Sequence, residues 1–183
     1  YYDAGSRSFY TKARPIRQPA DLRGLKIRVQ NSRTAMKMIE ALGGAPTPLA
    51  WGELYSALDQ GVVDGAENNP PSLLISRHYE LCKFYDLDEH TRVPDVVLIS
   101  THTWARLRPG VRAMLTEAAW ASSRFQRRLW AEKTEAALTA LAQAGVVISR
   151  PDKRPFQEAV QGLHANDAGQ EVSRLLEQVQ AVQ

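Results

Sequence analysis

The residues best suited to hold a small charged ligand lie in two short stretches, "LKIRVQN" at 25–31 and "GAENNPP" at 65–71. Arg28 lies near the carboxyl end of an expected strand, where the ligands of open α/β sheets collect. A guanidinium at that place can hold a carboxylate with two parallel hydrogen bonds, which an ammonium group cannot match. The residues alone leave open a second interpretation, a surface arginine that contacts a helix cap.

The second stretch places Glu67, Asn68 and Asn69 side by side, directly before Pro70 and Pro71. Amides supply both donors and acceptors, and a carboxylate accepts hydrogen bonds from hydroxyl groups. The three side chains would therefore suit a polyhydroxylated ligand. The alternative is an ordinary turn, since Asn and Pro are turn residues, although two prolines favour a rigidly presented cluster.

Catalytic and metal-binding patterns are not found in the sequence. There is no nucleophile elbow, P-loop or dinucleotide glycine pattern, and the four histidines share no metal-ligand spacing. The stretch "DLDEH" at 86–90 resembles a hard-metal cluster, but a lone acidic loop is more typical of a solvated turn or of salt bridges. Cys82 lies in an apolar stretch and is expected to be a buried packing residue. We expect no enzyme, no metal site and no cofactor.

The elements that must position these residues alternate along the first half of the chain. A period of two predicts a strand over 25–30, and Asn31 or Ser32 can cap a helix over 33–42. A strand at 47–50, a helix at 51–60 and a strand that begins at 62 follow. Such alternation predicts an α/β fold with a largely parallel sheet flanked by helices.

The second half contains one very long helix. A helix is expected from Pro70, and "PDVVLIS" at 94–100 is typical of a fully buried strand. The segment 109–144 is rich in helix-forming residues, and a helix of that length would span roughly 50 Å. That length exceeds the diameter of a domain of this size, so the helix is expected to bridge two lobes. A strand at 146–149 and two terminal helices, after Pro155 and after Gly169, complete the prediction.

Composition limits the classes of protein and partner. The 183 residues can build one sizeable domain, or one domain and a fraction of another. No apolar run is long enough to cross a bilayer. The formal net charge is +3 with basic and acidic residues interspersed, which argues against a nucleic-acid partner and suits an anionic small ligand. A single cysteine excludes an internal disulfide. The first residues resemble neither a signal peptide nor a methionine start, so we expect a cut inside a longer protein.

Three stretches carry a family resemblance: "GSRSFYTKARPI", "DLRGLKIRV" and "LGGAPTPLAWGELYSALDQGVVDGAENNP". Followed by the long helix, they resemble the solute-binding proteins of TRAP transporters (the DctP type) over essentially the whole chain. The resemblance implies a lobe of the type II periplasmic-binding-protein fold and a periplasmic location. It also implies a small organic-acid ligand held between two α/β lobes, and delivery to membrane subunits driven by a sodium gradient, without catalysis.

The resemblance also implies roles for individual residues. Arg28 matches the arginine that clamps the ligand carboxylate, and Asn68, with Glu67 beside it, matches the asparagine of the family's "VDG-x-EN" motif. Arg7 matches an upstream arginine, and Trp51 matches an aromatic residue that lines the cleft. Asn69 and the double proline are not general to the family. They resemble the branch that handles sugar acids such as hexuronates, so we add Asn69 to the candidate ligand residues.

Domain organisation follows from the same resemblance. Residues 1–93 and 134–183 are expected to form the second lobe, and residues 94–133 to complete a first lobe that is otherwise missing. Without that lobe, the apolar strand at 94–100 is expected to pack on a second copy or to leave an exposed patch that favours oligomers. A C4-dicarboxylate or 2-oxo acid, with Arg7 as a second charge, remains open as the ligand. A ligand-sensing domain on the same scaffold remains open as the function.

Overall fold

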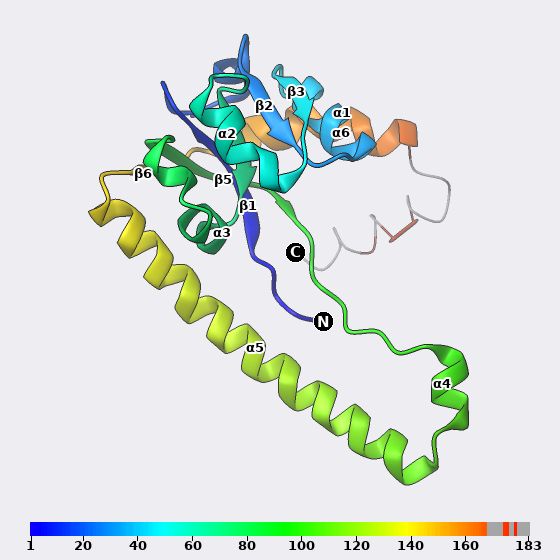
Figure 1. Ribbon diagram of the computed structural model, residues 1–183. Helices are drawn as coiled ribbons and strands as arrows, with labels where there is room; N and C mark the ends of the chain where they lie inside the picture. The colour runs from blue at the N-terminus through cyan, green and yellow to red at the C-terminus, as the bar shows by residue number, and fades with distance from the viewer. Residues whose placement is uncertain (168–173, 176–177, 179–183) are drawn as a thin grey trace.

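The computed structural model describes residues 1–167, 174–175 and 178. In this part of the chain the sheet has six strands in the order β3-β2-β4-β1-β5-β6 (Figure 1). Its strands are β1 (Ser6–Thr11), β2 (Lys26–Val29), β3 (Ala45–Pro48), β4 (Gly65–Asn68), β5 (Phe84–Arg92) and β6 (Val147–Ser149). The pairings β2–β3, β2–β4 and β5–β6 are parallel, whereas β1 runs antiparallel to β4 and β5. The sheet is therefore mostly parallel, as predicted.

Reversal of β1 determines which residues meet. Because β1 is antiparallel to its neighbours, its first residues lie at the same edge of the sheet as the last residues of β4 and β5. Ser8 is paired with Asn68, and Arg7 with Thr91. Arg28, one residue before the end of β2, is paired with Ala66 of β4. This edge, at the carboxyl ends of β2, β4 and β5, is the site edge described below.

Helices cover both faces of the sheet, and each face has its own apolar core. Alternate side chains of a strand point to opposite faces, and Phe9 and Tyr10 of β1 accordingly lie in different cores. The Tyr10 core packs against α2 (Leu54–Asp59), α3 (Pro70–Ile75) and the carboxyl end of α5 (Pro109–Gln143). The Phe9 core packs against α1 (Arg33–Ala41) and α6 (Arg154–Asp167). Cys82 is fully buried in the Tyr10 core, as predicted, and burial raises the pKa of its thiol to about 12.

Several element boundaries confirm the sequence predictions. The Ser32 hydroxyl caps α1 by accepting a hydrogen bond from the Ala35 amide, at 3.4 Å. Pro70 stands in the first turn of α3, and α5 begins at Pro109 and ends at Gln143, two residues before Gly145. The helix expected after Pro155 is α6. The helix expected after Gly169 falls largely outside the described residues.

One predicted strand and one predicted turn are corrected. The pair Val62 and Val63 forms a turn closed by hydrogen bonds from both amides to the Ala57 carbonyl. The strand begins at Gly65, so Glu67 and Asn68 are buried strand residues rather than loop residues. A side chain could not replace hydrogen at residue 65, since a Cβ atom there would lie 2.4 Å from the Tyr10 carbonyl oxygen. The acidic stretch 86–90 is likewise not a solvated turn, because it lies in β5 with Asp86 and Asp88 buried. The salt bridges that were the other expectation for this stretch are present, between Asp88 and His90 and between Glu89 and Lys153.

The segment 94–100 is not a buried strand. Its residues form no ladder with any described strand beyond one isolated bridge, between Tyr2 and Asp95. Val97 and Leu98 are 66% and 84% exposed, as expected for an apolar segment without a sheet partner. This part of the chain, with α4 (Thr101–Arg106) and the first half of α5, projects from the sheet (Figure 1). The lobe boundaries at residues 93 and 134 stay a prediction.

Within the described residues, none of the helices combines the length and the hydropathy that crossing a bilayer requires.

Candidate functional site

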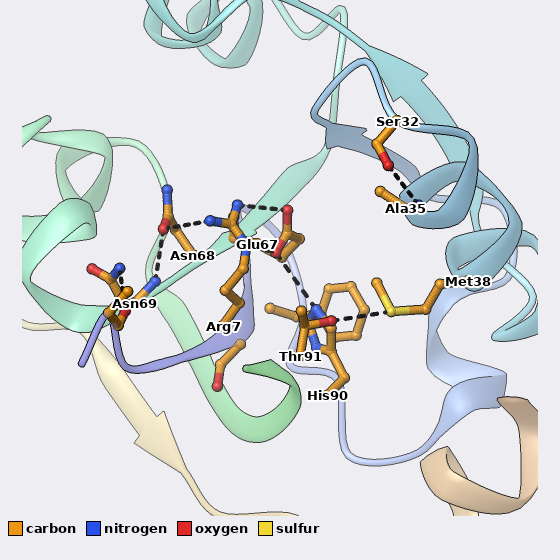
Figure 2. A network of polar contacts seen from close by, with 12 residues as sticks. Arg7, Ser32, Ala35, Met38, Glu67, Asn68, Asn69, His90 and Thr91 are labelled. Carbon is orange, nitrogen blue, oxygen red and sulfur yellow. Dashed lines mark hydrogen bonds and ion pairs between the residues drawn. The ribbon is translucent and has the colours of Figure 1, made fainter. Parts of the chain in front are cut away.

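Arg7, Glu67 and Asn68 form one connected group at the site edge (Figure 2). The Arg7 guanidinium holds the Glu67 carboxylate with both Nε and Nη2, the latter donating to Oε1 at 2.8 Å. Nη2 also donates to the Glu67 carbonyl oxygen at 2.9 Å, and Nη1 donates to Asn68 Oδ1 at 3.1 Å. Burial lowers the pKa of Arg7, but the hydrogen bond and the charge of Glu67 outweigh burial and raise it. Arg7 is thus a cation whose charge is already matched.

His90 extends this group across β5. Its Nδ1 lies 2.6 Å from Asp88 Oδ2 and its Nε2 lies 3.6 Å from Glu67 Oε2. The ring stacks on Phe9, with the centroids 4.2 Å apart. Burial lowers the pKa of His90, but the two flanking carboxylates outweigh burial and raise it to about 9. For Glu67, burial raises the pKa, while His90 and Arg7 together bring it below its ordinary value.

Arg28 is buried, with 3% of its surface exposed, and its charge is not matched. Nε and Nη2 both donate to the Leu49 carbonyl oxygen, at 3.0 and 2.8 Å. Nη1 has no hydrogen-bond partner among the described residues, and no carboxylate there lies within ion-pairing distance of the guanidinium. Burial lowers the pKa of Arg28, and the nearby Arg7 lowers it further, against the opposing influence of Tyr10 and Glu67. A buried cation with a spare donor calls for an anion.

Trp51 stands beside Arg28 and is held by His78. The Arg28 Cζ atom lies over the indole ring, 5.4 Å from its centroid, a cation–π geometry. The His78 ring lies 5.1 Å from the same indole, and its Nδ1 is 2.9 Å from the Tyr10 hydroxyl oxygen. Trp51 is 43% exposed, so one side of this aromatic surface is open to a ligand.

Asn69 has a structural role that its neighbour Asn68 lacks. Its Oδ1 accepts a hydrogen bond from the Ser72 amide at 2.9 Å and so caps α3. Its Nδ2 donates to the Ala4 carbonyl oxygen at 3.1 Å. Both polar groups of the side chain therefore have partners within the protein. Contact between Asn69 and a ligand stays a prediction.

A hollow of about 390 Å³ opens next to Arg28. It is lined by Arg28, Gln30, Asn31, Pro48, Leu49, Ala50 and Glu53. Among the described residues, no group of histidine, cysteine or acidic side chains could hold a metal ion. The arrangement offers one unmatched guanidinium, an aromatic surface and neutral amides, which is a binding surface for a polar anion.

Two histidines were not among the residues selected from the sequence. Neither shares a metal-ligand spacing with another histidine, and His90 belongs to the acidic stretch 86–90, which is typical of a solvated turn or of salt bridges. A usable signal did exist for His90, since Asp86, Asp88 and His90 alternate with Tyr85 and Leu87 as in a strand. No comparable pattern marks His78, which follows Arg77 in a left-handed backbone conformation at φ 61°.

Comparison with known proteins agrees with this geometry. The family described as bacterial extracellular solute-binding protein, family 7 (DctP), matches residues 1–170, and the chain belongs to this family. Solved structures that match the chain include TRAP periplasmic solute-binding proteins, and the fold is that of type II periplasmic-binding proteins.

Two curated relatives illustrate the range of sequence identity. YiiZ of Salmonella typhimurium, named as an uncharacterized protein, is 42% identical over 165 residues, which cover 90% of this chain and 50% of the relative. The 2,3-diketo-L-gulonate-binding periplasmic protein YiaO of Escherichia coli is 30% identical over 161 residues, covering 87% of this chain and 49% of the relative. The chain spans about half the length of these relatives.

Solved structures with bound sugar acids are among the matches. A TRAP periplasmic solute-binding protein from Chromohalobacter salexigens with bound D-glucuronate has a TM-score of 0.94 and 37% identity, covering 100% of this chain and 62% of that chain. One from Sulfitobacter with bound β-D-galacturonate has a TM-score of 0.88 and 40% identity, covering 96% of this chain and 59% of that chain.

Proposed function

We propose that this chain forms one side of the ligand cleft of a TRAP-type solute-binding protein and captures a hexuronate through Arg28. The observation that carries the proposal is the buried Arg28 guanidinium, whose Nη1 has no partner among the described residues. A ligand carboxylate would supply the missing acceptor and the missing negative charge. Because two of the guanidinium nitrogens are already fixed on Leu49, little freedom is lost when the ligand binds.

A sugar ring suits the surroundings of Arg28 better than a bare carboxylate does. The exposed side of Trp51 can pack against the apolar face of a ring, and amides can hydrogen-bond its hydroxyl groups. Solved relatives at 37–40% identity hold D-glucuronate and β-D-galacturonate. A relative at 30% identity is named for 2,3-diketo-L-gulonate, which is also a sugar acid.

Arg7 argues against a dicarboxylate such as succinate as the preferred ligand. A second carboxylate needs a second free cation, and the Arg7 guanidinium is already bound at two nitrogens by Glu67. A relative at 30% identity is nevertheless a C4-dicarboxylate-binding periplasmic protein from Rhodobacter capsulatus. C4-dicarboxylates therefore belong in the test.

We further propose that residues 1–93 and 134–183 form one lobe, and that residues 94–133 belong structurally with a second lobe. The lobes would close on the ligand by bending at hinges, one of them in α5. The bound sugar acid would then pass to TRAP membrane subunits from the periplasm, where the family acts. We propose no catalytic role, and the contacts of His90 with Asp88 and of His78 with Tyr10 support structural rather than catalytic histidines.

Calorimetry on a binding protein of the relatives' full length that contains this chain tests the proposal. The ligand panel is D-glucuronate, D-galacturonate, succinate and pyruvate. We expect saturable binding of at least one hexuronate and weaker or no binding of succinate and pyruvate. Binding of succinate without either hexuronate would reject the sugar-acid assignment, and binding of none of the four would reject the proposed ligand class.

A further inference from the structure

The protonation of His90 is determined by the two oxygens between which it lies. Asp88 Oδ2, 2.6 Å from Nδ1, can only accept a hydrogen bond when ionised, so Nδ1 carries a proton. Nε2 is buried, has no hydrogen-bond partner among the described residues, and faces Glu67 Oε2 at 3.6 Å. In the neutral ring, the Nε2 lone pair would point at a carboxylate. Only the imidazolium offers a proton to both oxygens.

Counting the charges of this cluster gives a simple result. Two carboxylates, Asp88 and Glu67, face two cations, Arg7 and protonated His90. Two further ion pairs adjoin the cluster, Lys153 with Glu89 on the α6 side and Arg92 with Asp3 at the end of β5. Each is internally matched. Asp86, also buried in β5, lies outside the cluster: its carboxylate accepts hydrogen bonds from the Ile16 amide and the Ser149 hydroxyl, and burial together with the charge of Asp88 raises its pKa. The four charges of the cluster itself therefore cancel as long as His90 holds its second proton.

We propose that protonated His90 neutralises the wall formed by Arg7, Glu67 and Asp88. Arg28 is then the unmatched cation of the site, and the site prefers ligands with a single carboxylate. His90 is thus a positioning residue that acts through Glu67 and Arg7 rather than by touching the ligand. The inference rests on the proposed function, because the ligand must be an acid held at Arg28.

Loss of the second proton has a definite consequence. The wall would then carry a net negative charge beside the bound carboxylate, and Glu67 would lose one of its two cationic neighbours. A unit charge about 10 Å from the ligand weakens binding roughly tenfold at an effective dielectric constant of 20. The pKa of His90, about 9, places this loss at alkaline pH. Tyr10 and Tyr85 do not titrate in that range, because burial raises the pKa of each hydroxyl well above its ordinary value.

Calorimetry of D-glucuronate binding at pH 6.5, 8 and 9.5, in buffers of different ionisation enthalpy, tests the inference. In the wild-type full-length protein, affinity should fall roughly tenfold across the series, and binding near pH 9 should take up a proton. His90→Gln should bind more weakly at pH 6.5 and show no change with pH. The control His102→Gln, at an exposed position on α4, should keep the wild-type profile. Equal pH profiles for wild type and His90→Gln would overturn the inference while leaving the sugar-acid assignment intact.

A second experiment compares ligands with one and with two carboxylates, and a third, an NMR titration, needs no ligand. Glu67→Gln frees Arg7 and should shift the preference toward D-glucarate, the dicarboxylate analogue, by roughly tenfold relative to D-glucuronate; an unchanged ratio in a variant that melts cooperatively counts against the proposal. By NMR, the His90 ring should titrate near pH 9. A His90 midpoint at or below 6.5 would overturn the inference even if no hexuronate binds.

Discussion

Replacing Arg28 by lysine keeps a positive charge at the end of β2 but removes the planar fork of the guanidinium. In the structure Nε and Nη2 of that fork donate hydrogen bonds to the Leu49 carbonyl oxygen, and Nη1 remains available for the ligand. A lysine ammonium is a single point on a flexible stem. It cannot hold the Leu49 carbonyl and a ligand carboxylate in the same geometry.

The size of the effect follows from burial. Arg28 is 3% exposed, so its pair with a carboxylate would form away from water. Removing one partner of a buried, hydrogen-bonded charge pair costs about 2–5 kcal/mol. At 1.4 kcal/mol for each tenfold change, this corresponds to a loss of affinity of roughly 30-fold to several thousand-fold. Arg28→Lys should fall within this range, and Arg28→Gln should lie at its upper end.

Isothermal calorimetry with D-glucuronate on the full-length protein measures this loss directly. Arg17→Lys is a matched control, since Arg17 is exposed and precedes β2 at the edge of the sheet away from the site. Thermal melting without ligand checks that each variant remains folded. An Arg28→Lys variant that melts normally and binds glucuronate within a few-fold of wild type would falsify the clamp.

Three further predictions concern stability and its coupling to the site. Glu67→Gln leaves the Arg7 guanidinium without its bidentate acceptor and should lower the free energy of unfolding by about 3 kcal/mol, measured by urea denaturation. Asn69→Ala removes the cap of α3 and should cost about 1 kcal/mol in the same assay; a parallel loss of glucuronate affinity would show that the amide also contacts the ligand. Burial and the charge of Arg28 lower the pKa of His78 to about 4, so the unfolded chain takes up the proton first. Stability should therefore fall as the pH drops from 6.5 toward 4, and His78→Gln should show a shallower fall between pH 6.5 and 5.

Matched substitutions separate these effects from general damage. Glu40→Gln is the control for Glu67, since Glu40 is exposed on α1. Gln143→Ala controls for the loss of an exposed amide, and His102→Gln for the loss of an exposed imidazole. Each control should stay within about 0.5 kcal/mol of wild type. A control that loses as much as its partner would show that the assay responds to substitution itself.

The helices were predictable because local signals determine them. Ser32 caps α1 through its own hydroxyl, and α5 ends just before Gly145, which has a positive φ of 82°. Each of these signals lies within a few residues of the helix end that it determines. The order of strands and helices from β2 to β4 followed from the same reasoning, whereas β1 was not predicted.

The position of β4 could not be predicted, because the reasons for it lie elsewhere in the fold. The sequence offers Val62 and Val63 as a typical strand start, but the Ala57 carbonyl draws both amides into a turn. The strand itself is built from small and polar residues, and Gly65 is required by the carbonyl of Tyr10, 55 positions earlier. Contacts of that sequence separation leave no local pattern.

The apolar segment at 94–100 shows the opposite case, in which a clear local pattern predicts a buried strand that does not form. Its composition is that of a buried strand, and burial depends on a neighbour that the local sequence does not reveal. The described part of the chain leaves Val97 and Leu98 exposed.

Among the site residues, Arg28 was selected by its place at a strand end. His90 was not selected, because the acidic stretch 86–90 was interpreted as a solvated turn or as salt-bridge residues, without regard to its period of two.

Burial of Cys82 makes the chain convenient for site-specific labelling at an introduced cysteine. Its single thiol lies in the Tyr10 core, and burial raises the thiol pKa to about 12, so labelling reagents at neutral pH should not react with it. A cysteine introduced at Gln30, an exposed residue that lines the hollow beside Arg28, would be the sole reactive thiol without any prior engineering. A solvatochromic dye attached there would convert ligand capture into a change of fluorescence, giving a reagentless sensor for sugar acids.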